Sequence, residues 1–84
     1  MTARFEVAVR LFGYHRELAG ESVVSVPLDT GATVGDLRKA LTEHPALRGA
    51  TIDAAIALNR RYETDDSVVA EGDEVAVIPP VAGG

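Results

Sequence analysis

The stretch RFEVAVRLF, residues 4–12, decides the fold because its apolar and polar side chains alternate. A period of two is typical of a half-buried β-strand, whose successive side chains point to opposite faces of a sheet. The face that we expect to be buried consists of Phe5, Val7, Val9 and Leu11. Phe12 is out of phase with these residues, so its ring should lie on the opposite face.

The segments that follow predict a second strand and a helix. Residues 14–19, between two glycines, fit either a loop or a helical turn, and residues 22–28 alternate again and should pair with the first strand. Thr33 can cap a helix by accepting from the backbone N–H near Asp36. The expected buried stripe is Val34, Leu37 and Leu41, with Arg38 and Lys39 pointing away from it. Pro45 should end this helix.

The sequence of the C-terminal half predicts several short strands and turns, followed by one longer strand. In order they are a strand at 55–59, a turn at Arg60-Arg61, a strand around Tyr62, a turn or one-turn helix at 65–70, and a tight turn at 71–73. The last strand should span residues 74–78 and end at Pro79-Pro80, because proline cannot donate to a sheet ladder. Ile78 is out of phase with Val75 and Val77, so it should share the outward face with Phe12.

This order of elements predicts an α+β protein with a β-grasp fold, in which a mixed sheet packs on one main helix. The first and last strands are the most apolar, so we expect them at the centre of the sheet. We expect one domain, residues 1–80, followed by a flexible tail, residues 81–84.

Composition narrows the possible functions. The chain has 84 residues, a net charge of -5 and no cysteine, which excludes disulfides, thiolate catalysis and cysteine-ligated zinc. The negative charge disfavours nucleic-acid binding and favours encounter with a basic protein surface, although it would serve solubility alone equally well. No apolar run reaches the roughly 18 residues of a membrane span, and no signal peptide is recognisable, so we expect a cytoplasmic protein.

Other patterns favour structural roles over metal or catalytic ones. His15 and His44 are far apart and lack ligands at metal-binding spacing, and we expect His44 at the surface of a helix end. The triplet Asp29-Thr30-Gly31 resembles that of aspartic proteases, but their chemistry needs two such loops, so a turn is favoured. The acidic pairs at 65–66 and 73–74 lack the spacing of an EF-hand loop. We therefore predict no bound metal or cofactor.

Residues 79–84, PPVAGG, are the most informative segment for function. Two prolines favour a stiff, extended start, and six extended residues reach on the order of 20 Å. The side chains then shrink to Gly83-Gly84, where nothing on Cα obstructs attack at the terminal carboxylate. This pattern predicts a tail that enters a narrow channel, with a frayed chain end as the alternative.

Several stretches resemble the small subunits of molybdopterin synthase, which are ubiquitin-like sulfur carriers. They are Leu11-Phe12, RELAG at 16–20, TVGDLR at 33–38, Leu58-Asn59, and EGDEVAVIPPVAGG at 71–84. The resemblance runs over the whole chain, and its closing stretch is the most specific part. One small departure is Gly13, where that family more often has alanine.

The resemblance implies that the carboxylate of Gly84, next to Gly83, is the reacting group. An adenylyltransferase similar to ubiquitin-activating enzymes would adenylate it with ATP, and a sulfurtransferase donor would supply the sulfur of a thiocarboxylate. Sulfur would then sit on the main chain, which explains how a carrier works without cysteine. The large synthase subunit would take the tail into its active site, so this chain would be non-catalytic alone.

The resemblance also implies a partner surface. The outward residues Phe12, Tyr62 and Ile78 match family positions that contact the activating enzyme and the large subunit, and an exposed apolar patch favours a partner site. The tail residues expected to contact the partner are Pro80, Val81 and Ala82. We expect acidic residues around the patch to aid encounter. In the alternative reading, loops cover the three side chains or the side chains pair with one another.

Three other functions stay open at this point. The chain could carry sulfur for another pathway, such as thiamine or cysteine synthesis, with the same chemistry at Gly84. It could be a ubiquitin-like modifier that is joined to lysines, or an interaction domain without chemistry. The stretch Arg16-Glu17-Leu18 and the Pro-Pro-Val ending favour the molybdopterin pathway.

Overall fold

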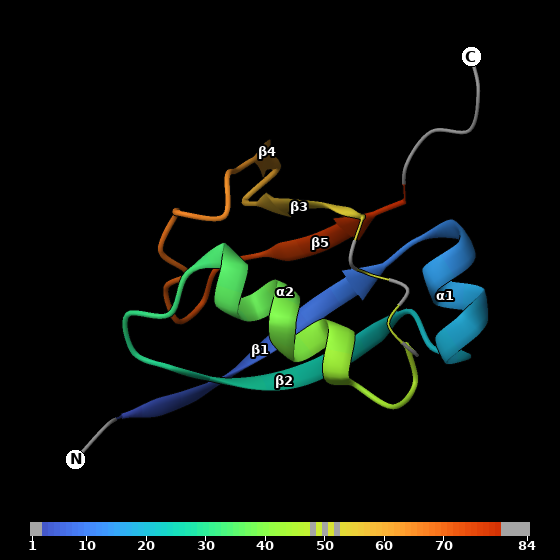
Figure 1. Cartoon of the computed structure of the whole chain (residues 1–84), viewed down its shortest axis with the longest axis horizontal. Coiled ribbons are helices and arrows are strands. Elements are labelled where there is room, and N and C mark those ends of the chain that lie inside the picture. The colour runs from blue at the N-terminus through green and yellow to red at the C-terminus, as the bar shows by residue number, and fades with distance from the viewer. Residues whose placement is uncertain (1–2, 48, 50, 52, 80–84) are drawn as a thin grey trace.

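The computed structural model describes residues 3–47, 49, 51 and 53–79. Its elements are β1 (Arg4–Leu11), α1 (Gly13–Ala19), β2 (Val23–Asp29), α2 (Val34–Glu43), β3 (Ala55–Leu58), β4 (Arg61–Tyr62) and β5 (Val75–Ile78). The strands form one mixed sheet in the order β2-β1-β5-β3-β4, and α2 lies across one of its faces (Figure 1). The predicted α+β β-grasp architecture is therefore confirmed.

The centre of the sheet is the pair formed by the first and last strands, as predicted. β1 and β5 run parallel, with Val9 opposite Val75 and Leu11 opposite Val77. β1 also pairs with β2 in an antiparallel hairpin, and β5 pairs with β3 on its other side. Because β1 and β5 end at the same edge of the sheet, α1 and the end of β5 lie at one end of the molecule (Figure 1).

The core lies between α2 and the inward face of the sheet. Burial alternates strictly along β1 and β2, as the period of two predicts. From the helix, Val34, Leu37 and Leu41 are fully buried and confirm the predicted stripe. Opposite them lie the inward side chains of the central strands, namely Val7, Val9, Leu11, Val75 and Val77.

Both ends of α2 follow the predicted local chemistry. The hydroxyl of Thr33 accepts from the backbone N–H of Asp36 at 3.3 Å, and the Asp36 carboxylate accepts from the N–H of Thr33 at 2.9 Å. This reciprocal capping box satisfies two backbone donors at the helix start. At the other end, His44 is already extended, because the following Pro45 disfavours a helical conformation there.

Some local predictions need correction. Residues 14–19, left open between a loop and a helical turn, belong to helix α1. The turn predicted at Arg60-Arg61 instead has Asn59 and Arg60 at its centre, with φ of 52° and 69°, and Arg61 already belongs to β4. Two positive φ angles are what a two-residue hairpin turn of type I′ requires, and asparagine tolerates that region better than arginine does.

Arg38 was expected to point away from the buried stripe of α2, and its contacts do lie outside that stripe. Its side chain is half-buried and forms an ion pair with Asp65 at 3.2 Å. Its guanidinium also donates to the carbonyl oxygens of Thr51 and Ala54, just before β3. Arg38 therefore ties α2 to two loops that are distant in sequence.

No helix among the described residues is long and apolar enough to cross a membrane.

Candidate functional site

The helix-free face of the sheet carries the outward side chains predicted from strand phase. Phe12 follows β1 directly and is 42% exposed, and Ile78 at the end of β5 is half-buried. Because Leu11 lies opposite Val77 in a parallel pair, Phe12 and Ile78 are neighbours one residue further along. The structure therefore brings these two predicted residues together.

Tyr62 lies on the same face but farther away. It is opposite Ala57 on β3, Ala57 is opposite Ala76 on β5, and Ala76 is opposite Arg10 on β1. Three strand spacings put Tyr62 about 14 Å from β1. Its side chain is 71% exposed. Tyr62 therefore lies at the opposite edge of the helix-free face, which we call the open face, and is not a direct neighbour of Phe12.

Between Phe12 and Tyr62 lies a row of small side chains that the sequence analysis did not identify as part of the site. We call it the alanine floor, and it consists of Ala55, Ala57 and Ala76. Ala55 lies opposite Ile78, and the other two lie in the row that leads from Tyr62 to β1. Ala55 is exposed and Ala76 is half-buried, whereas Ala57 is only 7% exposed. A methyl group barely rises above the backbone, so larger side chains of a partner can approach the sheet closely at Ala55 and Ala76. The signal that could have revealed the floor is the sequence itself, in which Ala55 and Ala57 alternate with Ile56 and Leu58, and Ala76 stands between Val75 and Val77.

Charges of both signs surround the open face. Arg10 borders the alanine floor from β1, and Glu6 lies farther along the same strand, where its carboxylate accepts from the hydroxyl of Ser25 at 3.1 Å. Near Tyr62, Arg60 and Glu74 approach each other at 3.8 Å, and both side chains are largely exposed. The rim is therefore mixed in sign, and the prediction of a rim of acidic residues is only partly correct.

The end of β5 leads toward the predicted reactive segment. The last described residue, Pro79, is half-buried, beside the start of α1. The remaining predicted tail residues lie outside the described part of the chain, and they are Pro80, Val81, Ala82, Gly83 and Gly84. The structure therefore shows only where the tail begins, which is at Pro79, beside the edge of the open face that carries Phe12 and Ile78.

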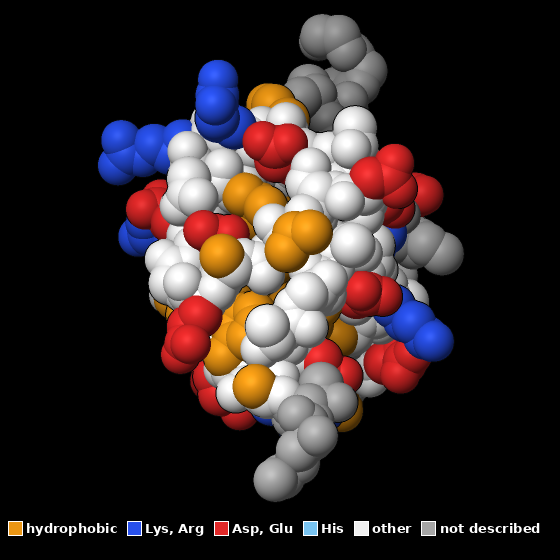
Figure 2. Space-filling model, turned by 90° about the vertical axis from the view of Figure 1, so that its left-hand side faces the viewer, with side chains coloured by type: hydrophobic (Ala, Val, Ile, Leu, Met, Phe, Trp, Pro, Cys, Tyr) orange, Lys and Arg blue, Asp and Glu red, His pale blue; other side chains and the backbone are white. Residues whose placement is uncertain are grey.

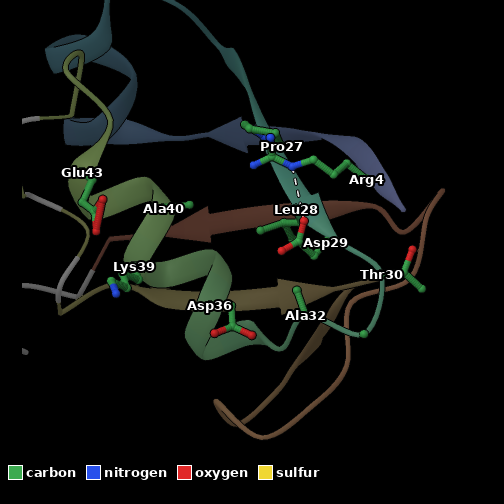
Figure 3. A pocket seen from close by; sticks show the side chains of 11 residues that line it. Arg4, Pro27, Leu28, Asp29, Thr30, Ala32, Asp36, Lys39, Ala40 and Glu43 are labelled. Atoms are coloured by element: carbon green, nitrogen blue, oxygen red, sulfur yellow. Dashed lines mark ion pairs between the residues drawn. The ribbon is translucent and has the colours of Figure 1, made fainter. Parts of the chain in front are cut away.

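Two hollows lie elsewhere on the molecule. One, of about 670 Å³, runs between β2 and α2 (Figure 3). Among its charged groups, Arg4 pairs with Asp29 at 3.3 Å and Asp36 caps α2, and Lys39 and Glu43 also line it from the helix. A smaller one, of about 340 Å³, has Phe5 and Val69 in its wall. Figure 2 looks onto that end, where apolar side chains gather among Asp and Glu. Neither hollow contains a predicted site residue.

Histidines and acidic groups make no metal centre in the described part of the chain, where no cluster of three or more His, Asp or Glu could hold an ion. His15 is buried in α1, with its ring edge against Tyr14 at a centroid distance of 5.7 Å. His44, at the end of α2, is half-buried, and its Nδ1 accepts from the N–H of Ala46 at 3.1 Å. Both imidazoles therefore act as structural side chains.

Comparison with known proteins assigns the family. Residues 9–84 match the ThiS family. The chain belongs to the ThiS family. It is 34% identical to a molybdopterin synthase sulfur carrier subunit of Arabidopsis thaliana, over 99% of this chain and 88% of that protein.

Solved structures agree with this assignment. The crystal structure of Haloferax volcanii small archaeal modifier protein 1 superposes with a TM-score of 0.77, at 34% identity over 94% of this chain and 99% of that one. A second neighbour is a chain in the complex of subunits 1 and 2 of the molybdopterin-converting factor from Helicobacter pylori. Its TM-score is 0.66 at 28% identity, over 95% of this chain and all of that one. The ubiquitin-like fold is therefore shown by sequence and structure alike.

Proposed function

We propose that this protein is the sulfur-carrier small subunit of a cytoplasmic molybdopterin synthase, with Gly84 as the residue that carries sulfur. Membership of the ThiS family over residues 9–84 supports this proposal most strongly. Relatives that cover nearly the whole chain are named as molybdopterin synthase sulfur carrier subunits. The absence of cysteine in all 84 residues also supports it, because sulfur must then be held on the main chain.

The chemistry needs two activation steps before sulfur is delivered. The carboxylate of Gly84 attacks the α-phosphate of ATP on an adenylyltransferase, forming an acyl adenylate and releasing pyrophosphate. Sulfur from a sulfurtransferase donor, delivered at the oxidation level of sulfide, then attacks the carbonyl carbon of Gly84. The bond from that carbon to the AMP oxygen breaks, AMP leaves, and the thiocarboxylate remains. The large synthase subunit accepts the tail and catalyses sulfur transfer to the pterin precursor, so this chain supplies a reacting group and catalyses nothing alone.

The open face supplies the docking surface in this proposal. Phe12 and Ile78 lie at the edge where β5 ends, so a partner that covers them also meets the start of the tail. The alanine floor extends that contact toward Tyr62 without burying polar side chains. A complex of subunits 1 and 2 in the Helicobacter pylori neighbour supports a two-subunit arrangement of this kind.

Intact-mass analysis tests the proposal. The protein is incubated with its adenylyltransferase, ATP and a sulfur donor, and one oxygen should be replaced by sulfur at Gly84. Deletion of Gly84 should abolish the change completely while the thermal melting curve stays the same, because the described core is built from residues between Phe5 and Val77. A mass change that maps to any other residue, or that persists in the deletion, would show that the reactive group has been misassigned.

A modifier role is the second candidate, because the chain is also similar to small archaeal modifier protein 1. In that case Gly84 would appear in isopeptide bonds to lysines of other proteins. Lys39 is the only lysine of this chain, and it lies exposed on α2. Chains linked to one another through lysine would therefore disappear entirely in a Lys39→Arg variant, whereas a pure sulfur carrier would never form them.

A further inference from the structure

The smaller hollow lies at the end of the molecule that is opposite α1 and the end of β5 (Figure 1). Residues 30–31 line one side of it and residues 68–71 line another, and Phe5 near the start of β1 completes the lining. Phe5 and Leu11 are six residues apart on β1, which corresponds to about 20 Å. The hollow is therefore well separated from the edge of the open face where β5 ends.

Val68 is the large apolar side chain that is exposed at this hollow. It is 60% exposed, whereas the next residue, Val69, is 1% exposed and belongs to the core. The backbone is held on both sides of Val68. Before it, the carbonyl oxygen of Ser67 accepts from the N–H of Val34 at 2.8 Å, and after it the N–H of Val69 donates to the carbonyl oxygen of Ala32 at 2.8 Å. A partner would therefore meet a preformed surface, which lowers the ordering cost of binding.

The loop that carries Val68 is strongly acidic. Residues 63–74 contain six carboxylate side chains and no lysine or arginine. Ion pairs with Arg38 and Arg60 offset two of these charges. Glu71 is exposed and lines the hollow itself. An exposed apolar side chain thus stands in a negatively charged surrounding.

This combination selects among the possible occupants of the hollow. Carboxylates repel the phosphate groups of nucleic acids and of anionic lipid headgroups. A second copy that docked through the same face would bring like charges together, because a two-fold interface places the same patch on both sides. A protein segment that is both basic and apolar matches the charge and the exposed valine.

We propose that the smaller hollow docks a segment of a partner protein in which branched apolar side chains alternate with lysines or arginines. An apolar side chain would enter the hollow against Val68, and the cations would face Glu71 and the other carboxylates of residues 63–74. Such a partner would leave Phe12 and Ile78 on the open face uncovered. The inference holds whether or not Gly84 carries sulfur.

Three end-capped synthetic peptides test the chemistry of the hollow: Lys-Leu-Lys-Leu-Lys, Glu-Leu-Glu-Leu-Glu and Lys-Ser-Lys-Ser-Lys. Each is titrated into the isolated protein while amide chemical shifts are recorded. The lysine–leucine peptide should move the signals of Thr30, Gly31 and residues 68–71 until they saturate, and should leave those of Phe12 and Ile78 in place. The glutamate peptide should move none of them, and the serine peptide should bind roughly fivefold more weakly or worse. At 1 M salt, where the screening length is about 3 Å, the lysine–leucine peptide should also bind more weakly.

Two matched pairs of variants locate the site. Val68→Thr replaces an exposed methyl group by a hydroxyl, and Val23→Thr makes the same change at a valine that is 44% exposed on β2. Glu71→Gln removes a charge beside the hollow, and Glu17→Gln removes one on α1 at the other end of the molecule. All four side chains are exposed, so each variant should keep its fold. Val68→Thr should raise the Kd of the lysine–leucine peptide roughly threefold and Glu71→Gln about twofold, and the two control variants should bind like wild type.

Several results would overturn the assignment of this hollow. One is the absence of any shift at residues 68–71 with the lysine–leucine peptide, and another is an equal shift with the glutamate peptide. Equal weakening in Val68→Thr and Val23→Thr would mean that the peptide binds by charge alone. Shifts of the same signals when the protein alone is concentrated would identify a second copy as the occupant. Failure of the mass change at Gly84 would refute the proposed function and leave these outcomes as they are.

Discussion

The two faces of the sheet use the same strands for different purposes. The face under α2 is filled with branched side chains such as Val9 and Leu11, which are at most 1% exposed. The open face has alanines between Tyr62 on one side and Phe12 with Ile78 on the other. Large inward side chains fill volume against a helix, whereas small outward ones leave the backbone accessible to a partner. In the proposed function, stability and recognition are thereby separated by the alternation of neighbouring residues.

The largest expected effect comes from the covered face, and Leu11→Ala tests it. Leu11 is 1% exposed within the core, so its truncation should lower the free energy of unfolding by about 2–5 kcal/mol through lost burial and a cavity. Urea denaturation measures this loss. The affinity of the remaining folded protein for the large subunit should be nearly unchanged. A strong loss of affinity at unchanged stability would mean that the two faces do not divide their roles in this way.

Phe12→Ala is the matched variant on the open face, one residue along the chain. Its ring is 42% exposed and outside the core cluster, so stability should change little. If it is an anchor, binding of the large subunit should weaken by about 1–3 kcal/mol, roughly tenfold or more. Titration calorimetry and thermal melting on the same sample measure both quantities. A variant that binds like wild type but melts far lower would place Phe12 in the core and reverse the assignment of faces.

The parts of this comparison that sequence could predict depend on local rules. Alternation along β1 and β5 placed Phe12 and Ile78 outward, because the side-chain period of a strand is two. Thr33 and Asp36 marked the helix start through capping chemistry that is complete within four residues. These interactions need no knowledge of which distant segments meet.

The parts that sequence missed depend on long-range pairing. The alanine floor exists only because β5 lies between β1 and β3, so that Ala57 meets Ala76. Arg38 looked like a solvent-exposed residue because its partners before β3 and at Asp65 are 13 to 27 residues away. The hairpin turn was misplaced by one residue although Asn59 signalled it, since asparagine is the common choice at positive φ.

Asn59 also shows how a side chain can reinforce backbone pairing at the end of a strand, because its own N–H donates to the carbonyl oxygen of Glu74 at 2.7 Å. Its amide nitrogen donates to the Asp73 carboxylate at 3.1 Å, and its amide oxygen accepts from the N–H of Glu74 at 3.0 Å. These bonds join the β3–β4 turn to the turn that precedes β5. They fix the strand that carries Ala76 and Ile78 relative to the strand that carries Ala57, which keeps the open face in register.

The smallest expected effect concerns the charged rim, and Glu6→Gln measures it. Glu6 is exposed on the open face, and rim charges change association rates more than dissociation rates. At low salt the association rate constant for the large subunit should change by less than about threefold, and the difference should vanish near 1 M salt, where the screening length is about 3 Å. Glu43→Gln, on exposed α2, makes the same change of net charge away from this face. Stopped-flow association should separate the two variants. Equal effects would mean that the net charge of -5, and not the charge beside the open face, steers the encounter.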